Sequence, residues 1–256
     1  MRPGVAPGLV RTSNHAFSTS RAGRLSWKLG PPEPPSVHPS ASSPSEPEMS
    51  MSEQLRALMR FVAHPVVVCT SSLPAATATS TKSTPRGMTM SSFTSLSLDP
   101  TPVVALNIAT PSRTLDAIVA SRNLNIHIVA GNAAGARLAD WFTRGNAQGA
   151  AAFDGLPSGC ECTVRASDDV AHGADPPLLV GRGVLHVLRC RLLDEPSQGL
   201  VKVRDHVMVL GEVVHLVQGY EASDQGQEEL FGLIYADRKY RKLGSTMVRS
   251  ARSIEP

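Results

Sequence analysis

The stretch Gly87-Met88-Thr89-Met90-Ser91-Ser92-Phe93-Thr94-Ser95-Leu96-Ser97-Leu98-Asp99-Pro100 decides how the rest of the chain is interpreted. Its polar and apolar residues alternate, so an extended strand over 88–98 has one face rich in hydroxyls and one face of mainly methionine and leucine. A strand exposed to solvent on one side and a strand that lines a ligand site both account for this pattern. Glycine at 87 allows a ligand to approach the backbone closely, because it has no side chain in the way.

A second polar cluster follows the next expected strand, 102–109. The residues Thr110-Pro111-Ser112-Arg113-Thr114 come where a helix is expected to begin. Free amides at a helix start, the hydroxyls of Ser112 and Thr114 and the guanidinium of Arg113 are groups that bind a terminal phosphate. A serine N-cap with Arg113 in solvent explains the same residues, so both interpretations stay open.

Three helices are predicted from caps and apolar spacing. Ser50 and Glu53 fit a capping box, and the other two helices are expected to begin after Ser112 and Asn132. The residues expected to face inward are Leu55, Leu58, Met59 and Val62 in the first helix, Leu115, Ile118 and Val119 in the second, and Leu138, Trp141 and Phe142 in the third.

The remaining apolar segments are typical of strands. β-branched and alternating residues bounded by turn residues predict strands at 66–70, 88–98, 102–109, 124–130, 160–166, 183–193 and 206–217. Many strands with few helices, and no regular alternation of the two, favour a mainly β fold with an antiparallel barrel over a doubly wound sheet. The run 168–177 is expected to be a surface insertion.

The composition excludes several classes of protein. The 256 residues carry a net charge of +3, and no stretch approaches the 18 apolar residues that a membrane-spanning helix needs. From residue 51 onward, 20 Lys and Arg nearly balance 19 Asp and Glu, so no broad basic face for nucleic acid is expected. Cys160-Glu161-Cys162 lacks the spacing of a zinc site, so no metal centre is expected. The basic run 237–242 could serve a nucleic acid or the 2′-phosphate of NADPH, although a solvated charged segment is commoner.

Together, five motifs resemble the flavin reductase-like, FMN-binding split-barrel family. They occur in the family's order and span about 53–244. The motifs are the run 87–100, Pro111-Ser112-Arg113-Thr114 with 124–129, the helix end Leu138-Ala139-Asp140-Trp141-Phe142, the run 205–213, and Leu233-Ile234-Tyr235 with Lys239-Tyr240-Arg241.

The resemblance implies a homodimeric split barrel, a six- to eight-stranded antiparallel Greek-key barrel, which binds FMN or FAD and reduces it with NADH or NADPH. It implies that His206 is the catalytic residue, on the nicotinamide side of the flavin, where it orients the cofactor or helps to neutralise the reduced flavin. It also implies the cofactor-binding residues Gly87, Met88, Thr89, Ser91, Ser92, Leu106, Asn107, Ile108, Ser112, Arg113, Thr114 and Tyr240.

Three functions remain open at this point. The first is an NAD(P)H-dependent flavin reductase that supplies reduced flavin to a monooxygenase or reduces a small acceptor. The second is a non-catalytic flavin-binding scaffold, in which Arg204 (usually Gly in the family) and the insertions 73–85 and 168–177 block the nicotinamide side. The third is a flavin-dependent oxygenase.

The N-terminal segment has a different composition. Residues 1–50 contain nine of the 20 prolines, and the first 32 residues carry five Lys or Arg and no acidic residue. The run 11–21 resembles a mitochondrial presequence. We therefore expect 1–49 to be a disordered targeting segment and spacer, 50–246 the flavin reductase-like domain, and 247–256 a tail. A matrix location is expected, with a cytoplasmic protein as the alternative.

Overall fold

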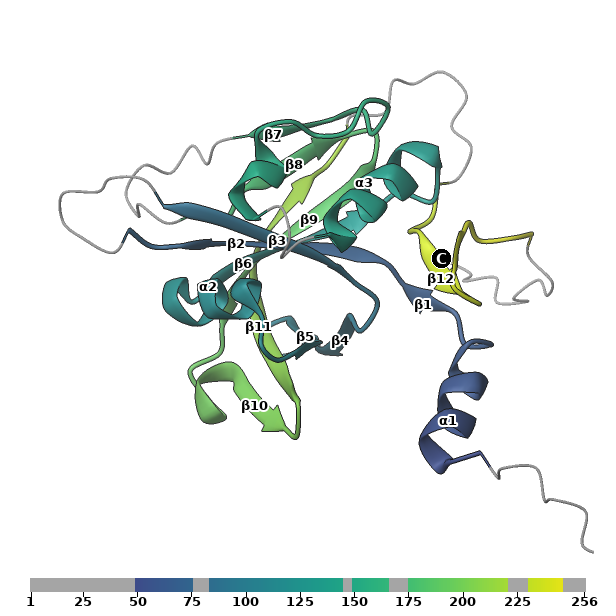
Figure 1. Ribbon diagram of the computed structural model, residues 1–256. Coiled ribbons are helices and arrows are strands. Elements are labelled where there is room, and N and C mark those ends of the chain that lie inside the picture. The colour runs from purple at the N-terminus through teal and green to yellow at the C-terminus, as the bar shows by residue number, and fades with distance from the viewer. Residues whose placement is uncertain (1–48, 76–82, 145–148, 166–174, 221–229, 246–256) are drawn as a thin grey trace, which may run out of the picture. The chain divides into compact units, whose positions relative to one another are not determined.

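A computed structural model describes residues 49–75, 83–144, 149–165, 175–220 and 230–245 of the chain (Figure 1). The predicted targeting segment and the predicted tail therefore lie almost wholly outside the described residues. The helices are α1 (Met51–Met59), α2 (Arg113–Ser121) and α3 (Ala133–Thr143), with short 3-10 helices at Gly149–Phe153 and Ser197–Gly199. Each described helix is too short to cross a membrane.

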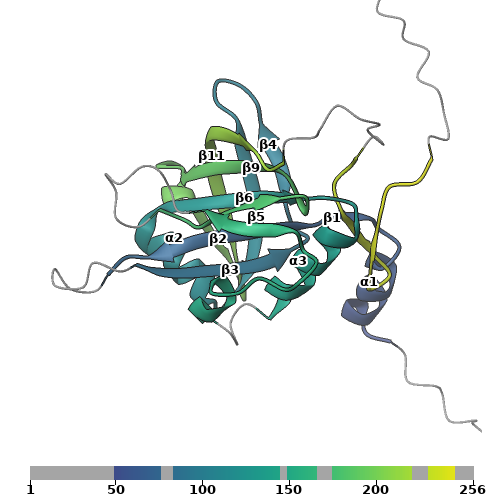
Figure 2. The same ribbon diagram turned by 90° about the horizontal axis from the view of Figure 1, so that it is seen from above.

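One antiparallel sheet dominates the described chain. Its main order is β3 (Thr84–Met90), β2 (Val67–Leu73), β6 (Asn123–Val129), β9 (Val184–Leu192), β11 (His206–Gln218), β5 (Val103–Ala109) and β4 (Thr94–Ser97), and β10 (Leu200–Val203) joins it on β11. Two small sheets contain β1 (His64–Pro65), β12 (Ile234–Ala236) and β13 (Lys239–Arg241) in one, and β7 (Cys162–Arg165) and β8 (Leu178–Gly181) in the other. Figure 2 shows the main sheet curving, with α3 beside β3. The mainly β, antiparallel split-barrel fold is confirmed.

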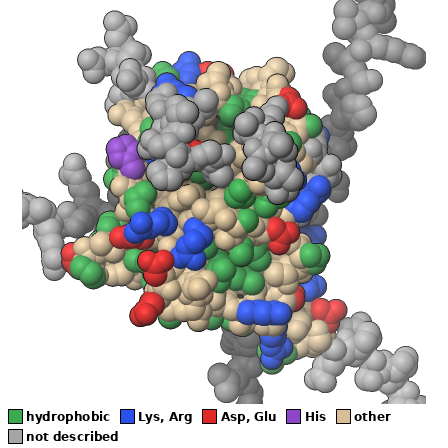
Figure 3. All heavy atoms as spheres, turned by 90° about the vertical axis from the view of Figure 1, so that its left-hand side faces the viewer, with side chains coloured by type: hydrophobic (Ala, Val, Ile, Leu, Met, Phe, Trp, Pro, Cys, Tyr) green, Lys and Arg blue, Asp and Glu red, His purple; other side chains and the backbone are tan. Residues whose placement is uncertain are grey.

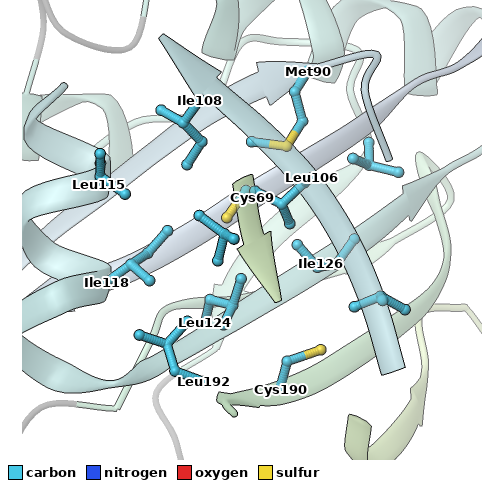
Figure 4. Packing of buried hydrophobic residues seen from close by; sticks show 13 residues of the cluster. Cys69, Met90, Leu106, Ile108, Leu115, Ile118, Leu124, Ile126, Cys190 and Leu192 are labelled. Carbon is cyan, nitrogen blue, oxygen red and sulfur yellow. The ribbon is translucent and has the colours of Figure 1, made fainter. Parts of the chain in front are cut away.

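The core lies on the inner side of this sheet. Side chains from β2, β5, β6 and β9 meet those of α2, and the ten labelled residues of Figure 4 point toward one another. Ile118 and Ile126 are fully buried there. A second cluster packs Phe142 and Leu138 of α3 against the opposite side of the sheet. Because the two clusters cover both faces of the sheet, the central strands β2 and β6 are buried along almost their whole length.

The prediction of a single strand over 88–98 is wrong. The structure divides it into β3, which ends at Met90, and β4, which begins at Thr94. Residues 91–93 turn the chain from one edge of the main sheet to the other. The periodicity could not show this break, because hydroxyl-bearing residues suit both strands and turns.

Two further expectations need correction. Val119 is half exposed rather than inward, since it lies on the solvent side of α2. None of the apolar residues of α1 is buried, although its predicted capping box is present. Most of the predicted surface insertion, residues 168–174, lies outside the described residues, and at its described end the carbonyl of Pro177 accepts from Thr70 Oγ1 at 2.7 Å.

Candidate functional site

The turn between β3 and β4 is fixed by Ser92. Its hydroxyl accepts a hydrogen bond from the Asn107 backbone N–H and donates one to the Asn107 carbonyl, both at 3.0 Å. One side chain thus satisfies both backbone groups of a residue in the middle of β5. Asn107 is exposed, whereas the neighbouring side chains of Leu106 and Ile108 are in the core. Of the three predicted residues on β5, only Asn107 therefore offers its side chain to a ligand.

His206 is brought to the same place by strand pairing. In the register of β5 and β11, Ala109 lies opposite His206 and Asn107 opposite Met208. The carboxylate of Asp205 lies 3.0 Å from Nδ1 of His206, and this hydrogen bond lowers the pKa of Asp205. A hollow of about 280 Å³ opens beside them, and it is lined by Asn107, Val203, Arg204, Asp205, His206 and Met208.

The start of α2 adjoins this hollow. Thr110 donates two hydrogen bonds to the Asp205 carbonyl, from its backbone N–H at 2.8 Å and from Oγ1 at 3.0 Å. The hydroxyl of Ser112 accepts from the N–H of Leu115, so Ser112 is the N-cap of the helix. Thr114 is 2% exposed, and its hydroxyl forms no hydrogen bond with any described residue. A buried hydroxyl without a partner is rare in proteins and suits a site that binds a polar group.

Two arginines converge beside this helix start. The Nη1 atoms of Arg86 and Arg113 lie 3.6 and 3.8 Å from the point where a Cβ atom on Gly149 would stand. Gly149 has φ +59°, a conformation that glycine adopts without strain. In the described part of the chain neither guanidinium is in an ion pair. Sequence reasoning missed Arg86 as a binding residue, because nothing local brings β3 close to α2.

The residues predicted at 87–89 have packing partners. A Cβ atom on Gly87 would lie 3.0 to 3.1 Å from the rings of Phe153 and Phe142, so glycine is needed there for packing. Thr89 Oγ1 donates to the Ala139 carbonyl at 2.6 Å, and Met88 packs on the core. Their side chains thus hold β3 against α3 and the core. The close approach that Gly87 permits is to aromatic rings of the protein.

Tyr240 lies elsewhere. Its ring packs against Tyr235 with centroids 5.7 Å apart, and burial raises its pKa to about 12. It lines another hollow, with Trp141 and Arg137. The structure therefore does not bring Tyr240 to the hollow at His206. Ser91 lines a third hollow, beside α1.

Figure 3 shows one face of the molecule, and the charged side chains on that face are of both signs. Blue Lys and Arg alternate there with red Asp and Glu and with green apolar atoms, so that face has no continuous basic area. Among the described residues, no three His, Cys, Asp or Glu side chains gather as a metal site.

Most of the chain matches the sequence model of one known protein family. The sequence model described as "Flavin reductase like domain" matches residues 59–244, which is well over half of the chain. The chain belongs to this family. The match includes Ser92, Asn107 and His206, the three residues that the fold brings together, and it confirms the resemblance seen in the motifs.

Solved structures show the same fold at low sequence identity. The NADH:FAD oxidoreductase SgcE6 of Streptomyces globisporus is 21% identical, with TM-score 0.52, over 82% of this chain and 99% of that one. A nitrilotriacetate monooxygenase component B homologue from Mycobacterium thermoresistibile is 21% identical, with TM-score 0.55, over 80% and 95%. The Sinorhizobium meliloti protein SMa0793 is 22% identical, with TM-score 0.51. The match covers 75% of this chain but only 53% of that one.

Proposed function

We propose that this flavin reductase-like protein binds FMN and reduces it with NADH or NADPH. The observation that carries the proposal is the meeting of three separate motifs: Ser92 bonds to Asn107, and Asn107 shares a hollow with His206. The third motif, the start of α2, is tied to the loop before His206 through Thr110. A flavin and a nicotinamide need such an open, mixed polar and apolar surface.

The residues at the start of α2 fit the phosphate end of FMN. Arg86 and Arg113 supply two cations, and Thr114 supplies a buried hydroxyl that has no partner among the described residues. The phosphate is a dianion, and it is favoured at the positive end of a helix. FAD, which carries a diphosphate, is the alternative flavin. Ser112 contributes by holding the helix start in place, because its hydroxyl is already engaged.

When bound, the flavin supplies the redox chemistry, since it accepts a hydride from the nicotinamide. The protein positions the two rings. His206 is held by the Asp205 carboxylate at Nδ1, so its Nε2 is the ring nitrogen left for cofactor or solvent. On this proposal His206 is the catalytic residue, and it offsets charge that develops on the reduced ring.

Arg204 supports a second candidate function. It stands in a two-residue loop between β10 and β11 with φ +54°, a conformation that favours the glycine usual in the family. Its side chain is exposed and lines the hollow at His206. If this side chain covers the nicotinamide position, the protein binds flavin without reducing it, as a scaffold. A flavin-dependent oxygenase would use the same hollow for another substrate.

The visible spectrum of the full-length protein tests the proposal. We expect FMN to bind and its absorbance to bleach when NADH or NADPH is added without oxygen. Flavin that binds but never bleaches would favour the scaffold, and bleaching restored by Arg204→Gly would identify the blocking group. No flavin binding at all would refute both. We expect His206→Ala to bind FMN and to bleach more slowly, and an unchanged rate would remove its assigned role.

We further propose a homodimer, delivery of reduced flavin to a monooxygenase, and import into the mitochondrial matrix directed by residues 1–49. Sedimentation at several concentrations tests the dimer. Oxidation of a substrate by an added monooxygenase that lacks its own reductase, in air and with NADH or NADPH, tests the delivery. Fusion of residues 1–49 to a fluorescent protein tests the targeting signal, and a diffuse cytosolic signal would refute it.

A further inference from the structure

The hollow that Ser91 lines has a volume of about 290 Å³ and lies between α1 and the hairpin of β12 and β13. Figure 1 shows α1 at the lower right, next to β1 and β12. The backbone N–H of Asp237 donates to the Arg60 carbonyl at 2.8 Å, which joins the hairpin to the end of α1. Three arginines, Arg56, Arg60 and Arg238, and one carboxylate, that of Asp237, line this basic hollow, so it has a surplus of positive charge.

The arginines of this hollow are available to an anion. Of the described carboxylates near it, Asp237 lies 3.9 Å from Arg241, and Glu53 is hydrogen-bonded to Ser50 at 2.8 Å. Arg56, Arg60 and Arg238 make no ion pair within the described ranges. Three guanidinium groups and one carboxylate, that of Asp237, line this concave site, and the surplus of positive charge favours an anionic ligand.

The conformation of the hairpin loop indicates that Arg238 has a role besides forming the turn. Asp237 and Arg238 form a two-residue loop, and both have left-handed φ angles, +49° and +58°. Glycine is preferred at such positions, and each other residue adds conformational strain. An arginine in this position lines the basic hollow at the expense of turn stability, which points to a role for its charge.

The basic hollow is linked to the hollow at His206 through the turn after β3. Ser91 lines the basic hollow. The next residue, Ser92, is hydrogen-bonded to Asn107, which lines the hollow at His206. Only two neighbouring residues, Ser91 and Ser92, therefore separate the lining of the two hollows along the chain, which favours one ligand that spans both. The start of α2, where the proposed function puts the flavin phosphate, uses a different pair of arginines, Arg86 and Arg113.

We propose that the basic hollow binds the 2′-phosphate of NADPH and makes NADPH the preferred hydride donor. The inference rests on the proposed function for the place of the nicotinamide ring, at His206. A 2′-phosphate is a phosphomonoester with close to two negative charges at neutral pH, whereas NADH has only a hydroxyl there. Arg56, Arg60 and Arg238 bind this group, and they take no part in hydride transfer.

Calorimetry on the full-length protein tests the site without turnover, with 2′,5′-ADP and 5′-AMP as probes. We expect 2′,5′-ADP to bind at least about tenfold more tightly, a difference of about 1.4 kcal/mol. Arg60→Gln and Arg238→Gly should abolish most of this difference. Lys239→Gln is the matched control, because Lys239 belongs to the same hairpin but does not line the hollow. Equal affinities for the two probes, or an equal loss in the control, would overturn the proposal.

Arg238→Gly separates binding from folding. Glycine relieves the left-handed conformation, so the variant should unfold at a higher temperature while it loses 2′,5′-ADP affinity. In anaerobic reduction of bound FMN, the half-saturating NADPH concentration should rise about tenfold, with NADH and the maximal rate unchanged. A variant that instead weakens FAD binding and leaves 2′,5′-ADP affinity intact would overturn the proposal. Absence of bleaching by either donor would refute the proposed function and the preference for NADPH as hydride donor, whereas the binding of the 2′-phosphate group is tested separately by calorimetry.

Discussion

Helices α1 and α2 have the same length and the same kind of start, yet they have different surroundings. Each has nine residues and follows a serine whose hydroxyl accepts from a backbone N–H three residues on. Four residues of α2 are buried against the sheet, whereas none of α1 is. Capping and amphipathic spacing are therefore common to both, and only packing distinguishes them. Helical stability in proteins comes mostly from tertiary packing, so the two helices should respond differently to equivalent substitutions.

The largest difference is expected from apolar side chains. Ile118→Ala in α2 should lower the free energy of unfolding by about 2–5 kcal/mol, because Ile118 is fully buried in the core. Leu58→Ala in α1 should change it by less than about 0.5 kcal/mol, because Leu58 is 59% exposed. Denaturant titration measures both. A large effect of Leu58→Ala that depends on protein concentration would contradict the comparison and indicate that α1 is buried in the proposed dimer.

The buried region should also make stability depend on pH. His127 of β6 is fully buried, with Nδ1 donating to the Val68 carbonyl at 2.9 Å and Nε2 accepting from the Leu179 N–H at 3.0 Å. Burial lowers its pKa to about 4. The unfolded chain, in which the pKa is about 6.5, therefore takes up a proton first as pH falls. Stability should drop by about 3 kcal/mol between pH 6.5 and 4 and no further from this group below pH 4.

Denaturant titrations at several pH values measure this effect. His127→Gln should be less stable at neutral pH and should lose the part of the pH dependence that belongs to His127. His215→Gln, an exposed residue of β11, is the control and should keep the full pH dependence. A profile for His127→Gln identical to that of the wild type would contradict the assignment.

The caps of the two helices give a smaller contrast. Ser112→Ala should cost about 1 kcal/mol of global stability, because it leaves a buried N–H of α2 without its partner. Ser50→Ala should reduce the helicity of α1 but change global stability by less than about 0.5 kcal/mol, since α1 has no buried side chain. Denaturant titration and circular dichroism measure the two effects. Equal losses of global stability would show that α1 is part of the cooperative unit.

The smallest expected effect is at the hairpin beside α1. Arg238→Gly should raise the free energy of unfolding by about 0.5 kcal/mol, because glycine adopts φ +58° without strain. Thermal unfolding of the variant and of Lys239→Gln, which should be unchanged, measures it. A less stable Arg238→Gly would indicate that the Arg238 side chain contributes contacts to the fold.

Much of the site could be predicted because its motifs are local. The capping serines, the pair Asp205-His206 and the hydroxyls around Ser92 are evident within a few residues. Arg86 could not be found this way, because its approach to Arg113 depends on where β3 lies relative to α2. The division of the 88–98 segment was also missed, since the turn there is fixed by a hydrogen bond to β5, 15 residues away.

The sequence by itself determined the fold class, the family and the helix starts, because strand alternation, caps and motif order depend on neighbours within a few positions. Tertiary structure alone decided which of those residues meet. Register between β5 and β11 placed His206 beside Asn107, packing made α2 a core helix and left α1 exposed, and the hairpin of β12 and β13 closed a basic hollow against α1. The physical reason is that such contacts join residues far apart in the chain, and their energies depend on burial and pairing that no local pattern contains.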